Sequence, residues 1–104
     1  MAVHRIASLD EIKPEDPTRV VVEGVPICVV RVGDGLFAVH DTCTHADVSL
    51  SEGEIDGEEM MVECWKHGSR FSLEDGRPDT LPATKPVPVY DVAVDGDDVV
   101  VTLP

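Results

Sequence analysis

Four residues in the middle of the chain are of the types that bind transition metals. Cys43 and His45 lie two positions apart, and Cys64 and His67 lie three positions apart, so each pair holds one Cys and one His. Eighteen residues separate His45 from Cys64, which is enough chain for two short loops to bring the pairs together. Thiolate and imidazole suit zinc, copper and iron. The pattern predicts a metal site formed by two loops.

The order of the four residues distinguishes two kinds of metal site. A zinc finger usually takes both Cys from one loop and both His from the other, whereas here each loop supplies one of each. This order resembles a Rieske centre, in which two Cys hold one iron of a two-iron, two-sulfide cluster and two His hold the other. A structural zinc site is the main alternative, because zinc accepts the same atoms. Buried structural thiols beside ordinary surface histidines are the second alternative.

Further residues extend the resemblance. The chain has Cys-X-His, then Cys-X-X-His-Gly-Ser-X-Phe, a Gly-X-Pro turn, and a proline-rich segment through residues 81–83. This series, which covers most of the chain, is similar to the small Rieske ferredoxins of multicomponent ring-hydroxylating oxygenases. The resemblance implies one Rieske 2Fe-2S cluster, with Cys43 and Cys64 at the inner iron and His45 and His67 at the outer iron.

Five other residues are expected close to the cluster. Trp65 is expected either to shield the cluster from water or to anchor a docking partner, and shielding is the preferred interpretation. Gly68 is expected to let the backbone pass close to the cluster, and Ser69 to donate to a sulfide or to serve only as a turn residue. The resemblance puts Phe71 beside the cluster, and it puts Pro82 in a loop that covers it.

The resemblance also predicts a low reduction potential within the Rieske range of roughly −150 to +300 mV. Respiratory-type Rieske proteins, at the upper end of that range, have a disulfide between the two loops and a Tyr hydroxyl near a cluster thiolate. Matched to their pattern, this chain has Val48 and Lys66 at the disulfide positions and Phe71 at the Tyr position. Both features that raise the potential are therefore missing.

Short runs of β-branched and apolar residues, separated by Gly, Pro and Asp, predict an all-β protein. The expected fold is a Rieske-like antiparallel β-sandwich, with a smaller cluster-binding subdomain inserted between scaffold strands. We expect a single domain over residues 1–104, with the cluster-binding region at about 41–84, and turns at 24–26, 33–35, 56–57, 74–77 and 95–98. Strands are expected at 3–7, 18–23, 27–32, 36–40, 60–63, 71–73, 87–94 and 99–103.

Two expectations concern how these elements assemble. The last hairpin is expected to pair with the N-terminal strands, which makes the metal region an insertion in one scaffold. Between residues 78 and 88, four prolines fix the backbone and remove donors, so this segment is predicted to be a stiff covering loop rather than a central strand.

The charge of the chain excludes two classes of partner. Twenty-one acidic and eight basic residues give a formal net charge of −13, which repels nucleic acid and anionic lipid. The same charge either steers the protein towards basic docking surfaces or simply keeps it soluble. No apolar run approaches the roughly 20 residues of a membrane helix, and the first five residues lack a signal-peptide core. A cytoplasmic protein is expected, with Cys28 as a buried core thiol in an apolar strand.

The resemblance implies an electron carrier rather than an enzyme. Rieske oxygenases have a further domain in which two His and a carboxylate hold mononuclear iron. Beyond the four predicted ligands, this chain has only two histidines, His4 and His40, and no room for such a domain. The implied function is single-electron transfer from an NAD(P)H-dependent flavin reductase to a terminal oxygenase of aromatic hydrocarbon catabolism. The alternatives are an accessory or regulatory Rieske subunit, for nitrite reductase or iron-sulfur metabolism, and a zinc-stabilised binding module.

Overall fold

The computed structural model describes residues 2–44, 48–66, 68–79 and 85–103. The described residues form nine strands, two single-turn 3-10 helices and no α-helix, so the predicted all-β class is confirmed. The elements, in chain order, are β1 (Ala2–Ser8), η1 (Leu9–Glu11), β2 (Thr18–Val22), β3 (Val25–Val32), β4 (Gly35–His40), η2 (Leu50–Glu52), β5 (Glu54–Asp56), β6 (Met61–Glu63), β7 (Arg70–Ser72), β8 (Val89–Asp95) and β9 (Asp98–Leu103).

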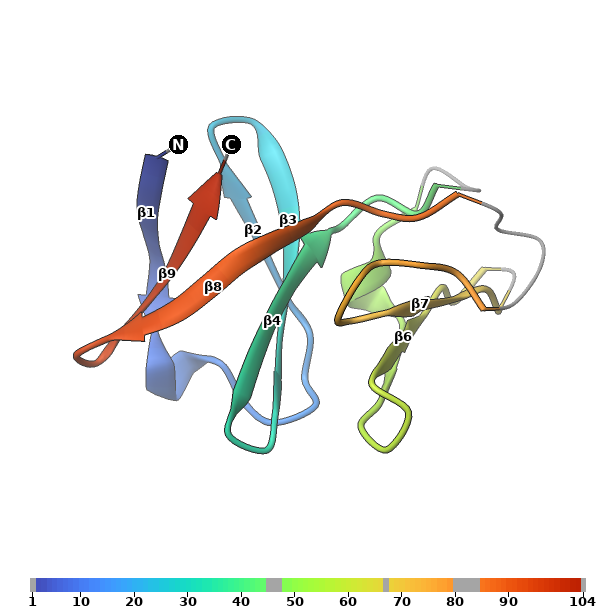
Figure 1. Ribbon diagram of the computed structural model, residues 1–104, viewed down its shortest axis with the longest axis horizontal. Helices are drawn as coiled ribbons and strands as arrows, with labels where there is room; N and C mark the ends of the chain where they lie inside the picture. The colour runs from blue at the N-terminus through green and yellow to red at the C-terminus, as the bar shows by residue number, and fades with distance from the viewer. Residues whose placement is uncertain (1, 45–47, 67, 80–84, 104) are drawn as a thin grey trace.

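Six strands form the scaffold in the order β1-β9-β8-β4-β3-β2, and all neighbouring pairs are antiparallel. Strands β8, β9 and β1 make one leaf and strands β4, β3 and β2 the other, joined by only two residue pairs between β4 and β8. The predicted pairing of the last hairpin with the N-terminal strand is confirmed, because β9 pairs with β1. The two termini therefore lie side by side (Figure 1).

The segment between β4 and β8 contains a separate small sheet with the order β5-β6-β7. In Figure 1 this sheet lies to the right of the scaffold, with both predicted metal loops on the same side. The insertion follows from connectivity, because β4 and β8 are neighbours in the scaffold although almost fifty residues lie between them in sequence. The smaller region that the sequence predicts within the scaffold is therefore present.

Strand β3 separates the two hydrophobic cores of the molecule. Its residues from Ile27 to Val30 are all fully buried, which is the pattern of a strand covered on both faces. Because successive side chains point to opposite faces, Ile27 and Val29 pack between the scaffold leaves while Cys28 and Val30 pack towards the small sheet. One strand thus couples the scaffold to the region that carries the metal loops.

The turn before β3 begins one residue earlier and ends two residues earlier than the predicted turn at 24–26. Val22 pairs with Val25, so the turn consists of Glu23 and Gly24, both with positive φ (51° and 80°), as in a type I′ hairpin. Pro26, expected in the turn, is a strand residue. Pro26 pairs with Val21, one position beyond the pair of Val22 and Val25 that closes the turn. Antiparallel pairs alternate between hydrogen-bonded and non-hydrogen-bonded ones, and this pair is of the second kind. Proline, which has no N–H, therefore costs no hydrogen bond to β2 here.

Candidate metal centre

The first metal loop begins two residues after β4. The amide of Cys43 donates to the carbonyl of Val48 (3.0 Å), and Thr42 and Ser49 form an antiparallel bridge beneath it. Cys43 therefore lies directly after the paired base of this loop, and η2 follows the other side of the base. The hydroxyl of Thr44 donates to the carbonyl of Lys85 (2.7 Å), which joins this loop to the segment that leads into β8.

The second metal loop is built in the same way. The amide of Cys64, directly after β6, donates to the carbonyl of Ser69 (2.7 Å). The spacing is again five residues, as between Cys43 and Val48. Inside this loop the amide of Gly68 donates back to the carbonyl of Cys64 (2.9 Å), with Gly68 at a φ of 74° that favours glycine. Each loop therefore presents its cysteine at the same point of a closed turn.

Both cysteines are buried in one apolar cluster. Cys43 is 4% exposed and Cys64 is not exposed at all, and both pack in the core that Val30 and Phe71 also occupy. The structure thus places in one core the two cysteines that the resemblance assigns to the inner iron. His45 and His67, the other two predicted ligands, lie outside the described residues, and so does Pro82.

The remaining predicted neighbours differ in burial. Ser69 and Phe71 are fully buried, whereas Trp65 exposes 53% of its surface and Lys66 is exposed as well. The ring of Phe71 packs in the same buried core as Cys43 and Cys64 and carries no hydroxyl group. Exposure of this size is compatible with both interpretations of Trp65, shielding of the cluster and docking of a partner.

Cys28 is buried, as the sequence predicts, and packs in the same core as Cys43 and Cys64. Burial raises the pKa of its thiol to about 12, and the charge of Asp41 adds to the rise. Its surroundings therefore keep Cys28 as a neutral thiol.

Sequence reasoning missed Asp41, a carboxylate that is 1% exposed and lies two residues before Cys43. It accepts hydrogen bonds from the hydroxyl of Ser49 and from the amide of Ser51 (2.9 Å), and it pairs with Arg19 (3.2 Å). The residues next to Asp41 do not distinguish it from the other acidic residues, of which the chain has 21 in all. Only Ser49 and Ser51, eight and ten positions later, could have indicated its role, because both can donate hydrogen bonds to it.

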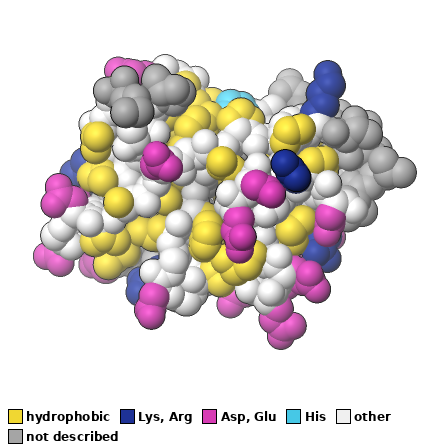
Figure 2. Space-filling model, in the orientation of Figure 1, with side chains coloured by type: hydrophobic (Ala, Val, Ile, Leu, Met, Phe, Trp, Pro, Cys, Tyr) yellow, Lys and Arg dark blue, Asp and Glu magenta, His cyan; other side chains and the backbone are white. Residues whose placement is uncertain are grey.

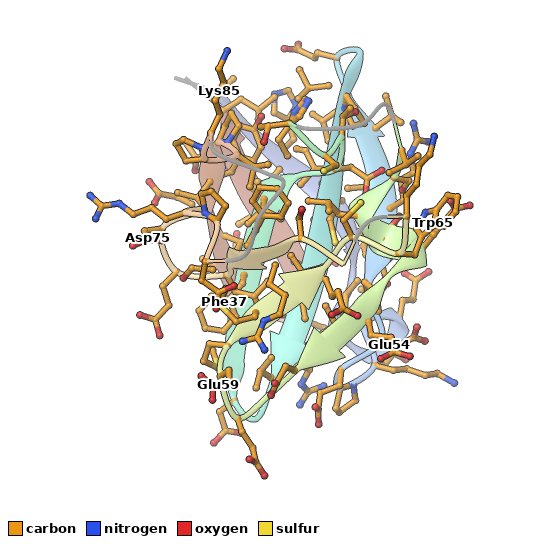
Figure 3. All side chains as sticks on the ribbon, turned by 90° about the vertical axis from the view of Figure 1, so that its right-hand side faces the viewer. Phe37, Glu54, Glu59, Trp65, Asp75 and Lys85 are labelled. Carbon is orange, nitrogen blue, oxygen red and sulfur yellow. The ribbon has the colours of Figure 1, made fainter. Side chains whose placement is uncertain are left out.

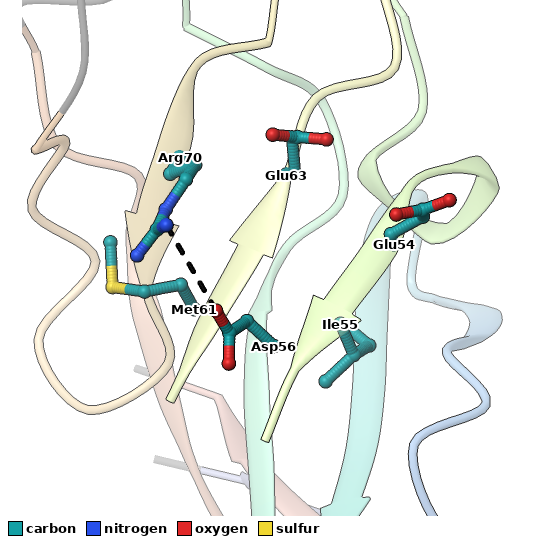
Figure 4. Close-up of a pocket in the computed structure, with 6 residues that line it drawn as sticks. All are labelled: Glu54, Ile55, Asp56, Met61, Glu63 and Arg70. Atoms are coloured by element: carbon teal, nitrogen blue, oxygen red, sulfur yellow. Dashed lines mark ion pairs between the residues drawn. The ribbon is translucent and has the colours of Figure 1, made fainter. Parts of the chain in front are cut away.

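A pocket on the small sheet is not part of this centre. It is lined by Glu54, Ile55, Asp56, Met61, Glu63 and Arg70, and Figure 4 shows the ion pair between Arg70 and Asp56 within it (3.9 Å). Of the predicted ligands that the structure describes, neither Cys43 nor Cys64 lines it. Arg70 also pairs with Asp79 (3.4 Å), so its role here is to tie β7 to neighbouring segments.

Comparison with known protein families identifies the centre. Residues 2–91 match the Rieske [2Fe-2S] domain model. The chain belongs to the Rieske [2Fe-2S] family. The ferredoxin component of biphenyl 2,3-dioxygenase from Rhodococcus jostii (strain RHA1) is 40% identical over 99% of this chain and 94% of its own length.

Solved structures of this Rieske family share the fold closely. The ferredoxin of carbazole 1,9a-dioxygenase from Nocardioides aromaticivorans IC177 superposes with a TM-score of 0.93 at 40% identity, covering 97% of both chains. A carbazole 1,9a-dioxygenase ferredoxin solved in complex with its reduced oxygenase has a TM-score of 0.88 at 38% identity, covering 95% of this chain and 91% of its own. A putative small subunit of a nitrite reductase has the same fold at 25% identity, with a TM-score of 0.85 and coverage of 99% and 100%.

Family membership implies one Rieske [2Fe-2S] cluster, and the described donor set fits it. Two thiols in equivalent loops, buried in one core, match the soft ligands that iron-sulfur clusters require. The core around them also excludes water, which tunes the potential of such a site. The residues present therefore suit the family's cofactor.

Proposed function

We propose that this protein is a one-electron carrier that passes electrons from a flavin-dependent NAD(P)H reductase to a terminal ring-hydroxylating oxygenase. The observation that carries this proposal is the 40% identity, over nearly the whole chain, to the ferredoxin component of a dioxygenase. The chain is accordingly an electron-transfer component of an oxygenase system and not the enzyme that oxidises the aromatic substrate.

The cluster supplies a site that gains and loses one electron. We propose that Cys43 and Cys64 bind it from the buried side, and that His45 and His67 complete the ligand set. In support, the two cysteine loops are closed by equivalent amide-to-carbonyl bonds, so the two cysteines hold equivalent positions in their loops. Ser69 and Phe71 are also buried and limit the access of water to the two cysteines from the protein interior.

We propose that partners dock at the end of the molecule that carries the two loops. Trp65 and Lys85 both reach the surface at this end, as Figure 3 shows in a view towards it. Exposed aromatic residues are common anchors in protein interfaces, and Lys66, next to Trp65, adds a cation to an otherwise acidic protein. A small ferredoxin of this family has been solved in complex with its oxygenase, which supports a similar partner here.

An accessory subunit of a nitrite reductase is the second candidate function, because a putative protein of that kind shares the fold. Its identity of 25% is well below the 40% of the dioxygenase ferredoxins. The lower similarity makes the oxygenase system the better assignment.

We further propose that residues 1–104 form a single Rieske domain with its cluster-binding region at about 41–84, and that the protein works in the cytoplasm. Within the described ranges, no helix is long and apolar enough to cross a membrane.

The test is an oxidised and a dithionite-reduced absorption spectrum of the purified protein, with iron and sulfide assayed on the same sample. The expected result is a red-brown protein that bleaches on reduction and holds about two irons and two sulfides per chain. Reduction by NADH with a ferredoxin reductase, followed by reoxidation with a ring-hydroxylating oxygenase, tests the carrier role. A colourless protein with one zinc per chain would contradict the assignment.

A further inference from the structure

Asp41 and Arg19 form an ion pair directly beneath the first metal loop. The Nε atom of Arg19, on β2, donates to Oδ2 of Asp41 at 3.2 Å. The carboxylate is 1% exposed, whereas the Arg19 side chain is 52% exposed. A buried anion is thus paired with a cation whose charge is largely screened by water, which leaves a net negative field on the buried side.

The hydrogen bonds of Asp41 fix the base of the loop. Its carboxylate accepts from the hydroxyl of Ser49 and the amide of Ser51, and the two serine hydroxyls bond each other at 2.6 Å. Its own amide donates to the carbonyl of Pro26 at 3.0 Å, and its carbonyl accepts from the amide of Leu50 at 2.6 Å. All side-chain partners are donors, which is the arrangement that an ionised carboxylate needs. Asp41 therefore holds both ends of the loop that presents Cys43.

The charge of Asp41 lies close to the proposed cluster ligands. Two residues of extended chain span at most about 7 Å, so the backbone of Asp41 is within that distance of Cys43. The same charge adds to the rise in the pKa of Cys28, whose thiol packs in the core shared by Cys43 and Cys64. An anion in the protein interior acts more strongly on a neighbouring charge than an anion in water does.

We propose that Asp41 is a positioning residue for the first cluster loop whose buried charge also lowers the reduction potential, and that Arg19 sets how much of that charge is felt. An anion nearby disfavours the addition of an electron, so it stabilises the oxidised cluster. This inference rests on the proposed function, because it concerns the potential of the same cluster.

Removing Asp41 and removing Arg19 are predicted to shift the reduction potential in opposite directions. This distinguishes an effect of charge from an effect of structural damage. Asp41→Asn removes the anion while keeping an oxygen for the Ser51 amide, and it favours reduction. Arg19→Gln removes the compensating cation, and it favours oxidation. Asp41→Asn is expected to shift the reduced-to-oxidised ratio at a fixed potential by about three- to tenfold. Arg19→Gln is expected to shift it in the opposite direction by a smaller factor, about two- to threefold, because water screens the exposed guanidinium. Damage to the ion pair as a merely structural element would move both potentials in the same direction or in neither.

The experiment is a spectroelectrochemical titration of the cluster-loaded wild type, Asp41→Asn, Arg19→Gln and Arg19→Lys, with electron paramagnetic resonance spectra of the reduced proteins. Arg19→Lys keeps the charge and is expected to keep the wild-type potential. The matched control is Arg5→Gln. Arg5 pairs with Asp98 through the same atom types at 2.8 Å and is 55% exposed, but it lies in the leaf formed by β1 and β9.

Opposite shifts in Asp41→Asn and Arg19→Gln, with Arg5→Gln unchanged, establish the proposal. Unchanged potentials in both variants, or equal shifts in Arg5→Gln, overturn it while leaving the electron carrier intact. If Asp41→Asn does not retain its cluster, the test is the reduction potential of Arg19→Gln alone. A lower potential than in the wild type supports the proposal, and an unchanged potential overturns it. The Arg19 side chain is half exposed, so its replacement is expected to leave the fold intact. A wild-type protein that contains zinc overturns the proposed function and this inference with it.

Discussion

At the scale of single residues, Cys28 is a thiol that its surroundings hold in the neutral form. It is fully buried, and its pKa is raised to about 12, first by burial and then by the charge of Asp41. The thiolate is the form that reacts with alkylating reagents. In the unfolded chain the thiol ionises near its ordinary pKa of about 8.5, so the folded state loses stability as the pH rises from about 9 towards 12.

We therefore expect iodoacetamide to label Cys28 in the folded protein at least about 100-fold more slowly than in the urea-unfolded chain at pH 9. The measurement is mass spectrometry of the tryptic peptide between Arg19 and Arg31, in which Cys28 is the only cysteine. Equal labelling rates in the folded and unfolded states would show that the thiol is accessible and ionises normally.

Phe71 is the second residue whose chemistry can be tested by a single change. Its ring is buried in the core with Cys43 and Cys64, at the position where respiratory-type Rieske proteins have Tyr. A hydroxyl there that donates to a cluster thiolate would stabilise the reduced state. Phe71→Tyr is expected to raise the midpoint potential by about 40 mV, the equivalent of ~1 kcal/mol for one electron.

The measurement is again a potentiometric titration, and Phe37→Tyr is the matched control. Phe37, the other phenylalanine, is only partly buried against the same core. A rise of the same size in both variants would mean that hydroxyl donation to the cluster is not the cause.

At the scale of elements, two glycines with nearly the same φ angle differ in their surroundings. Gly24 and Gly76 have φ values of 80° and 77°, so alanine is strained at either position. A Cβ on Gly24 meets no atom within 4 Å, whereas a Cβ on Gly76 would overlap with the carbonyl of Val87. The carbonyl of Gly76 also accepts from the amide of Val87 (2.9 Å), which ties the turn after β7 to the chain before β8.

Gly24→Ala is therefore expected to lower the free energy of unfolding by about 1 kcal/mol, and Gly76→Ala by at least about 3 kcal/mol, because backbone must shift as well. Urea unfolding monitored by circular dichroism measures both. A similar loss of unfolding free energy in both variants would show that the backbone at Val87 moves away from the new Cβ without a measurable loss of stability.

The elements themselves could largely be predicted from local sequence. The alternating and continuous apolar runs indicate the scaffold strands, although the burial of Ile27 to Val30 on both faces of β3 is apparent only in the structure. The neighbourhood of β4 and β8 could not be derived from local pattern, since it depends on contacts between distant segments. The type I′ turn at Glu23 was missed because a non-glycine residue adopts positive φ there.

The predicted site shows the same division. The order of the Cys and His residues, through its resemblance to a Rieske centre, predicts that Cys43 and Cys64 lie together, and both are in one buried core. The burial of Asp41 and the exposure of Trp65 were not predictable, because burial is a property of the packed fold rather than of the neighbouring sequence.

At the scale of the whole molecule, the net charge of −13 acts on every partner that approaches. Acidic side chains are spread over the face shown in Figure 2 and do not gather at one place. A distributed charge of this kind steers a partner by its overall field. Electron transfer to a basic acceptor such as cytochrome c is therefore expected to slow at least about tenfold between 0.01 M and 0.15 M salt, as the Debye length falls from about 30 Å to 8 Å. Transfer to anionic ferricyanide should accelerate over the same range.

Stopped-flow kinetics with single-charge variants tests whether the field is distributed. Glu63, on the small sheet near the second metal loop, and Asp95, at the far end of β8, each contribute one charge. If steering is a property of the whole molecule, Glu63→Gln and Asp95→Asn lower the rate with cytochrome c by similar, small factors at low salt. If only Glu63→Gln lowers the rate, the acidic residues near the metal loops form a local docking patch, and the remaining charge serves solubility alone.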